Sequence, residues 1–179
     1  MTRLIRALPA VLFALLIAGC SAGPSADAGH NDADVAFAQM MIPHHEQAIE
    51  MSETVLGKDG LDPRIRELAV DIKAAQGPEI GQLKAMLGRW GEPEEGHAGH
   101  GGHMDGMMTP GQLAELGSAD AAAAGPLFLE QMIAHHEGAV EMARAQLDDG
   151  RDPEALELAG KVIEDQESEI ALMEELLGR

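Results

Sequence analysis

Positions 37–51 read FAQMMIPHHEQAIEM, and positions 128–142 read FLEQMIAHHEGAVEM. Phe, Met, Ile, His-His-Glu, Ala, Glu and Met recur at matching places in the two copies. Within each copy, apolar residues return every three or four positions, which is the spacing of one face of an α-helix. We therefore predict two similar helices, each with a His-His pair near its centre.

A second matching segment follows each motif. Asp62-Pro63 and Asp152-Pro153 both read as a helix N-cap followed by proline in the first helical position. Hairpins with apolar inner faces bury them best against each other, so we expect an all-α four-helix bundle made of two repeated helical hairpins. The hairpins span 34–90 and 126–179, and a long crossover at 91–125 joins them.

Local signals predict how these helices begin and where they are interrupted. Asp32 or Asp34 is expected to cap the first helix, and Thr109-Pro110 a short helix in the crossover. Pro43 predicts a kink beside the first His-His pair, because proline removes a backbone donor. Gly77-Pro78 predicts a bend or a brief break in the second helix.

Composition narrows the class of protein. The 179 residues carry a formal net charge of −19 and only 2% aromatic residues. A core so poor in aromatic residues must be built mainly from Leu, Ile, Val, Ala and Met, which favours helices over sheet. A surface this acidic repels nucleic acid and attracts cations, so we expect no nucleic-acid partner.

The N-terminus reads as an export signal. Residues 1–19 combine basic Arg3 and Arg6 with an apolar run too short to span a bilayer. The sequence at 17–20 ends in Cys20, the single cysteine, and resembles a bacterial lipobox. We expect cleavage before Cys20, its lipidation, and a flexible tether over 20–33. The predicted location is the outer face of the cell membrane or the periplasm.

The crossover is rich in glycine and in soft metal ligands. Flexible backbone lets such side chains gather round an ion without strain, so we predict metal capture here. If Cys20 is lipidated, no thiolate remains, and any metal must be held by His, Met, Asp or Glu. The candidate ligands of the crossover are His97, His100, His103, Met104, Met107 and Met108.

Helical geometry groups the motif ligands. Side chains three, four and seven positions apart share a face, so His44 is expected to lie with Met40 and Met51. The same spacing places His135 with Met142. The second histidine of each pair, His45 and His136, falls on the flank, at the edge of the core. The pseudo-symmetry of the repeat predicts that His44 and His135 approach each other.

Imidazole and thioether without thiolate favour copper, because thioether suits Cu(I) and imidazole serves both oxidation states. Packing is the competing explanation, since methionine at helical spacing usually fills a core. A zincin is disfavoured because Ile49 and Val140 occupy the place of its second histidine. Di-iron bundles use Glu-x-x-His, which neither motif helix contains, although Glu50, Glu141, Glu79 and Glu169 are candidate carboxylates.

The two His-His-Glu motifs, at 41–46 and 132–137, resemble a bacterial family catalogued as domain of unknown function number three hundred and five. The resemblance covers about 34–179. It implies a ferritin-like helical bundle, usually exported, and in some members copper binding linked to copper tolerance. The residues that match the repeated family positions are His44, His45, Met51, His135, His136 and Met142.

These observations predict a lipid-anchored protein that binds or buffers copper in copper homeostasis or tolerance. A binding protein is favoured over an enzyme, and copper over iron. A di-iron or copper oxidase on the same bundle, and a structural or partner-binding bundle, are the alternatives. The expected partners are metal ions, the membrane through the Cys20 lipid, and either a metal-transfer protein or a second copy of the chain.

Overall fold

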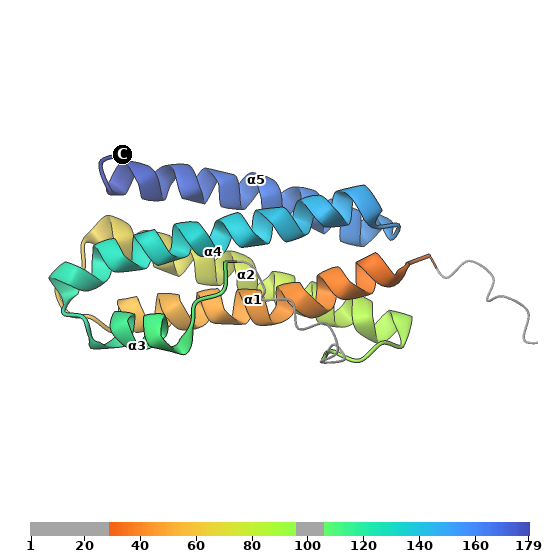
Figure 1. Cartoon of the computed structure of the whole chain (residues 1–179), viewed down its shortest axis with the longest axis horizontal. Helices are drawn as coiled ribbons and strands as arrows, with labels where there is room; N and C mark the ends of the chain where they lie inside the picture. Colours follow the sequence, from red (N-terminus) through yellow and green to blue (C-terminus); the bar gives the residue numbers. More distant parts are fainter. Residues whose placement is uncertain (1–28, 96–105) are drawn as a thin grey trace, which may run out of the picture.

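The computed structural model describes residues 29–95 and 106–179. Over those residues the chain forms five α-helices and no strand, so the predicted all-α class is confirmed. Four helices are long and lie along the same axis, and α3 is short (Figure 1). Their bounds are Asp32–Leu56 (α1), Pro63–Trp90 (α2), Pro110–Ser118 (α3), Ala121–Asp149 (α4) and Pro153–Leu176 (α5).

The helices begin where short polar side chains cap them. Asp62 and Asp152 cap α2 and α5 ahead of a proline, and Thr109 caps α3, all as predicted. At α1 the prediction was wrong by one residue or more, because Asn31 is the N-cap. Asp34 is its partner in a capping box, in which each side chain accepts the other residue's backbone N–H.

Prolines inside the long helices do not divide them. α1 continues through Pro43, and α2 continues through Gly77 and Pro78, so the predicted break in the second helix is wrong. α4 likewise contains Pro126, because it begins at Ala121, earlier than that proline. A proline removes one backbone donor, but packing of the helix face on either side of it keeps the axis continuous.

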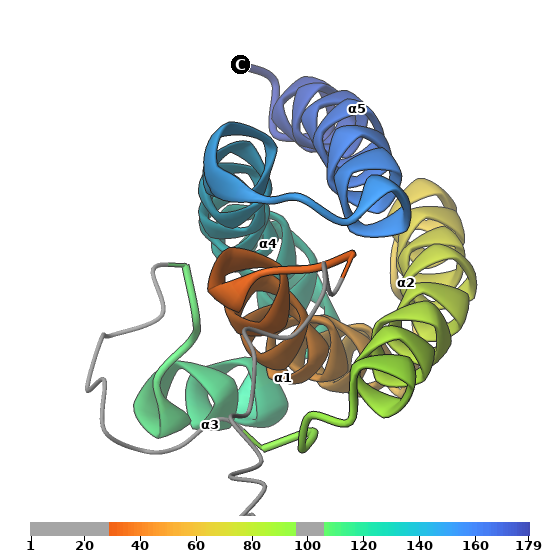
Figure 2. The same ribbon diagram turned by 90° about the vertical axis from the view of Figure 1, so that its right-hand side faces the viewer.

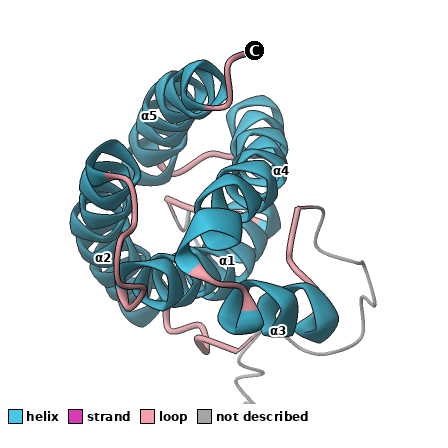
Figure 3. Cartoon of the chain, turned by 90° about the vertical axis from the view of Figure 1, so that its left-hand side faces the viewer, coloured by secondary structure: helices cyan, strands magenta, loops and turns pink. Residues whose placement is uncertain are grey.

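The four long helices surround one core. Viewed along the axis, they follow the order α1, α2, α5, α4 around the molecule (Figures 2 and 3). α1 packs most extensively on α2, and α4 on α5, while α1 and α4 also share a long contact. α3 lies outside this ring against α1 and α4, where Lys58 donates to the carbonyls of Gly117 and Ala119.

Two apolar clusters make up the core, and a buried polar layer lies between them. On α1, one cluster takes residues up to Ile42 and the other starts at Ala48. On α2, one cluster ends at Ile72 and the other begins at Leu83. The layer between the clusters contains eight polar side chains at corresponding places of the sequence repeat. Seven are buried, namely His44, His45, Gln76, Glu79, His135, His136 and Gln166, and Glu169 is partly buried.

One buried carboxylate ties the start of α1 to the turn between α4 and α5. Asp34 is fully buried and accepts hydrogen bonds from the side chain of Gln146 and the backbone N–H groups of Arg151 and Asp152. Gly150 makes room for this arrangement, because a Cβ there would lie 2.3 Å from Nε2 of Gln146. These hydrogen bonds connect residues more than one hundred positions apart and hold the start of α1 against the α4–α5 turn.

Candidate metal centre

His44 of α1 and His135 of α4 meet at the middle of the polar layer. Their ring centroids are 3.7 Å apart, and the rings are 0% and 1% exposed. The two residues occupy the same place in the two motif copies, so the predicted approach of His44 and His135 is confirmed. The structure therefore brings two imidazoles from helices far apart in sequence into direct contact inside the core.

The second histidine of each motif is buried as well. His45 and His136 are both 0% exposed, so the prediction that they lie at the edge of the core is wrong. His45 Nε2 lies 2.9 Å from a carboxylate oxygen of Glu79, and His136 Nε2 lies 2.6 Å from one of Glu169. Spacing along one helix predicts which side chains share a face of that helix. It does not show that a neighbouring helix covers the side on which His45 or His136 lies.

These carboxylates determine which nitrogen of each imidazole remains available. With a proton on Nε2 donated to the carboxylate, Nδ1 keeps its lone pair. Nδ1 of His45 and Nδ1 of His136 have no hydrogen-bond partner among the described residues. Histidines that bind metals usually donate their other ring N–H to a carboxylate in this way, and the carboxylate fixes the ring orientation.

Burial favours the neutral form of His135. It lowers the pKa of His135 well below the usual value of 6.5, and the neighbouring imidazoles of His44, His136 and His45 lower it further. Because neutral imidazole is the form that binds metal, no proton has to leave His135 near neutral pH. A hydrogen bond with the backbone of His44 partly opposes this lowering of the pKa, and no side chain of the described residues hydrogen-bonds to the His135 ring.

The two halves of the layer differ in their outer contacts. Glu79 also accepts a hydrogen bond from Lys161 of α5, at 2.8 Å. Burial raises the pKa of Glu79, but the bonds from His45 and Lys161 outweigh it, so the pKa lies below its usual 4.5. The Glu79 carboxylate is therefore ionised at neutral pH and holds a proton on Nε2 of His45 firmly.

The predicted thioether ligands are distributed over different parts of the molecule. Met51 is fully buried in the apolar cluster beyond the histidines. Met40 is 38% exposed, and Met142 is partly buried. Both line a surface pocket between α1 and α4. His44 is thus not surrounded by Met40 and Met51 as one compact group.

Part of the crossover can be described beside the histidines. His97, His100, His103 and Met104 lie outside the described residues, as does Cys20. Met108 is buried, and its backbone exchanges two hydrogen bonds with the side chain of Gln47. Met107 is partly buried between Met108 and Gly106.

Gly106 lies against the helix that carries His135. It adopts a φ of +85°, and a Cβ there would come within 2.9 Å of the carbonyl oxygen of His135 and 3.0 Å of Cα of Gly138. Only glycine meets both demands. Residues 106–108, hereafter the strap, therefore run from α4 to α1 across the groove next to the histidine pair.

Four polar residues of this layer, three buried and one partly buried, were not predicted as site residues. Glu79 and Glu169 were considered only as candidate carboxylates of a di-iron site, and Gln76 and Gln166 were not considered as ligands. Both glutamines are buried, and Gln76 has no hydrogen-bond partner in the described part of the chain. The available signal was their recurrence in both halves at places where a helix face is otherwise apolar.

The layer lacks a complete set of hard ligands. Over residues 29–95 and 106–179, no three His, Cys, Asp or Glu side chains are placed to hold one metal ion together. A tetrahedral zinc site or a di-iron site needs more nitrogen and oxygen donors than this. The arrangement instead offers two contacting imidazoles, two oriented imidazoles, and thioethers on the neighbouring surface.

Solved structures of similar proteins share this fold. A DUF305 fragment from Deinococcus radiodurans is 37% identical with a TM-score of 0.75, and the match covers 83% of this chain and 97% of that chain. The "putative secreted protein DUF305" from Streptomyces coelicolor is 36% identical, also with a TM-score of 0.75, and the match covers 82% of this chain and 92% of that one.

CopM is a structurally close protein that has been solved with metal. Its Cu(I)-bound form is 30% identical to this chain with a TM-score of 0.67, and the match covers 80% of this chain and 94% of CopM. CopM has also been solved in Cu(II)-bound and Ag-bound forms. These are properties of CopM.

A curated relative and a family model complete the comparison. Uncharacterized protein L153 of Acanthamoeba polyphaga mimivirus is 41% identical over 54 residues, which is 30% of this chain. The chain spans about a third of the length of that relative, since the match covers 35% of it. The model of the family named "Domain of unknown function (DUF305)" matches residues 34–177, so the chain belongs to the DUF305 family.

Proposed function

We propose that the protein binds copper at the buried histidine pair and buffers or hands on the ion outside the cytoplasm. One observation carries the proposal: His44 and His135, from the two motif copies, face each other at 3.7 Å in the core. Two imidazoles from different helices that meet in the core can offer two nitrogen donors to one metal ion.

The chemistry of the donors supports copper over other metals. Imidazole binds both Cu(I) and Cu(II), whereas thioether suits the softer Cu(I). We propose His44 and His135 as the two ligands of one ion in the core. Nδ1 of His45 and Nδ1 of His136 are proposed as separate nitrogen donors of the same layer, which are not placed to join that ion without a rearrangement. Glu79 and Glu169 then orient the rings, as carboxylates behind metal-bound histidines generally do. The copper-bound forms of the related CopM support the choice of metal.

A second candidate is an oxidase that uses the same layer. The pairing of Glu79 with His45 and of Glu169 with His136 places carboxylate and imidazole side by side on both halves. Such pairs are ingredients of a di-iron or copper oxidase. Two measurements distinguish the candidates. A di-iron oxidase requires iron in the purified protein, and either oxidase requires oxygen consumption with Fe(II) or Cu(I).

We further propose that the chain is exported and lipid-anchored, through a signal at 1–19 and Cys20. One observation supports export: a family member is named as a putative secreted protein. The residues between Cys20 and Asn31, the N-cap of α1, then tether a ferritin-like pair of repeated hairpins, one formed by α1 and α2 and the other by α4 and α5. Mass spectrometry of the native protein for an acylated Cys20 tests the anchor.

Titration with Cu(I) tests the main proposal. The protein, purified in the absence of copper, is expected to take up at least one Cu(I) per chain in competition with a chelator. Occupied protein should also melt at higher temperature, because a ligand that binds only the folded state contributes about 2.7 kcal/mol at a free concentration 100 times Kd. A copper-independent melting temperature and no uptake would contradict copper binding and favour a structural bundle.

Glu79→Gln is expected to weaken Cu(I) binding by about 10- to 100-fold, the usual effect of removing an outer carboxylate. The amide is neutral and can donate to Nε2, so His45 no longer keeps a single tautomer. Chelator competition measures the change. Glu46→Gln is the matched control, because Glu46 belongs to the same motif but pairs with Lys84 at the surface. Equal losses in both variants would contradict the role assigned to Glu79.

A further inference from the structure

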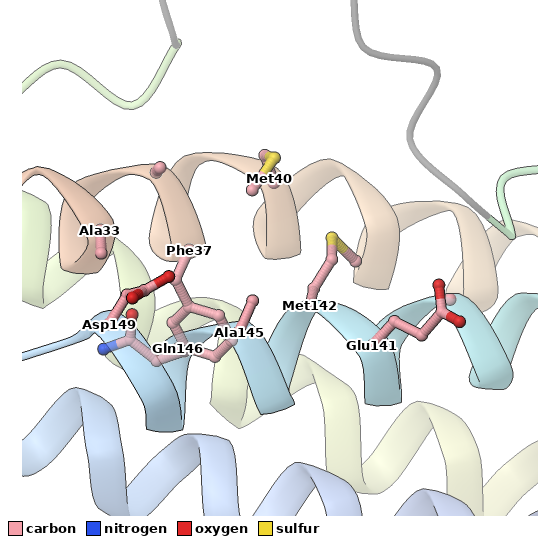
Figure 4. Close-up of a pocket in the computed structure, with 10 residues that line it drawn as sticks. Ala33, Phe37, Met40, Glu141, Met142, Ala145, Gln146 and Asp149 are labelled. Carbon is pink, nitrogen blue, oxygen red and sulfur yellow. The ribbon is translucent and has the colours of Figure 1, made fainter.

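A pocket of about 340 Å³ opens between α1 and α4 on the outside of the molecule. Met40 and Met142 line it from facing helices, and Phe37 and three alanines complete the apolar wall (Figure 4). Gly138 lies at the same pocket and also contacts the strap through Gly106. The pocket is therefore the part of the α1–α4 groove next to the strap.

All polar groups of the pocket are suited to a cation. Glu141 and Asp149 are carboxylates, and Gln146 is 2% exposed with an Oε1 that has no hydrogen-bond partner among the described residues. None of the lining residues is Lys, Arg or His. Carboxylates around a concave site raise the local concentration of positive ions. The two thioethers then select for a soft ion.

The pocket is close to the histidine pair along both helices. Met40 precedes His44 by four residues, so the two side chains are neighbours on one face of α1. Met142 follows His135 by seven residues, two turns along the same side of α4. Gly138 lies between them in the sequence and carries no side chain, and Gly106 of the strap packs against it. An ion held by the thioethers would be about one or two helical turns, ~5–11 Å, from the imidazoles.

We propose that Met40 and Met142 form a surface docking site for a soft monovalent cation, Cu(I), which then passes by ligand exchange to the buried histidines. No electron is transferred in this step, and the ion keeps its charge. The docking site stands on the pocket alone, whereas the transfer step rests on the proposed function. The exposure of Met40, which packing does not need, is explained by this role.

Methyl-labelled methionine spectroscopy tests the docking site. Ag(I), a redox-inert soft cation, is titrated into the full protein and into a His44→Leu/His135→Leu variant. We expect the methyl resonances of Met40 and Met142 to shift in both proteins below one equivalent of Ag(I), and that of the buried Met173 to remain in place. Single Met→Leu variants assign the resonances.

Loading kinetics test the transfer step. Met40→Leu/Met142→Leu is expected to slow the arrival of Cu(I) at the histidines by about tenfold or more, since the local concentration of the ion falls. Met173→Leu, which also removes one thioether, should load at the wild-type rate. Histidine ring resonances followed after rapid mixing report the arrival.

The outcomes separate the two ideas. Shifts of Met40 and Met142 that vanish in the histidine variant would make the thioethers mere extensions of the core site and overturn the docking site. No shift in either protein would overturn it as well. Thioether shifts that persist while the histidine rings never respond would support the docking site and contradict the proposed function.

Discussion

His44→Leu/His135→Leu is expected to abolish tight Cu(I) binding in the core, with a loss in affinity of more than 100-fold, because both central imidazole donors are removed. Leucine is close to histidine in volume, so the layer stays filled. The copper-dependent rise in melting temperature should disappear with the affinity. Chelator competition and thermal unfolding, each with and without Cu(I), measure the two effects.

The same variant is expected to be at least as stable as the wild type without copper. Two buried polar rings that contact each other are replaced together by apolar side chains, and such a paired replacement is nearly neutral or stabilising. His30→Leu is the control, since His30 stacks on Trp90 outside the polar layer. Undiminished copper affinity in the double variant, or an equal loss in His30→Leu, would contradict the assignment of the core pair.

Asp34→Ala is expected to lower the free energy of unfolding by about 3 kcal/mol, since several buried donors lose their acceptor at once. Those donors come from the N-cap of α1, from Gln146, and from the backbone of Arg151 and Asp152. Denaturant unfolding measures the change. Asp32→Ala is the matched control, because Asp32 is an exposed-side acidic residue of the same helical turn, and its loss should cost far less.

The contribution of Asp34 depends on pH. Burial raises the pKa of Asp34, but its hydrogen bonds outweigh burial and hold the pKa below the ordinary value of 3.8. A lowered folded-state pKa contributes stability that is complete above 3.8 and is lost as the pH falls through the folded value. The stability difference between wild type and Asp34→Asn should therefore be constant from neutral pH to about 5 and shrink in stronger acid. A difference that grows on acidification would contradict this role.

Local signals in the sequence predicted the helices well. Asp62-Pro63, Thr109-Pro110 and Asp152-Pro153 each begin a helix in the structure, because capping depends on neighbouring residues only. The duplicated motif also predicted that His44 and His135 approach each other. That prediction used symmetry between two copies, and symmetry carries information about tertiary structure that periodicity in one helix does not.

The surroundings of the site depend on contacts between helices. Full burial of His45 and His136 follows from Glu79 and Glu169 on the partner helices of the hairpins. Met40 shares a helical face with His44 but lies where no helix covers it, so it faces the pocket. Continuity through Pro78 likewise reflects packing on both sides of the proline. None of these outcomes can be read from the spacing along one helix.

The strap distinguishes two positions that correspond in the repeat. Gln47 holds the backbone of Met108, whereas Gly138, at the same place in the second motif, leaves space for Gly106. With glycine at both positions, the hydrogen bonds between Gln47 and Met108 would be lost. With glutamine at both, a side chain at position 138 would occupy the space of Gly106. The two motif copies thus share the same His-His-Glu residues but differ at the position next to the strap. The halves of the chain are no longer interchangeable, and a chain assembled from two copies of either half would lose its covered groove.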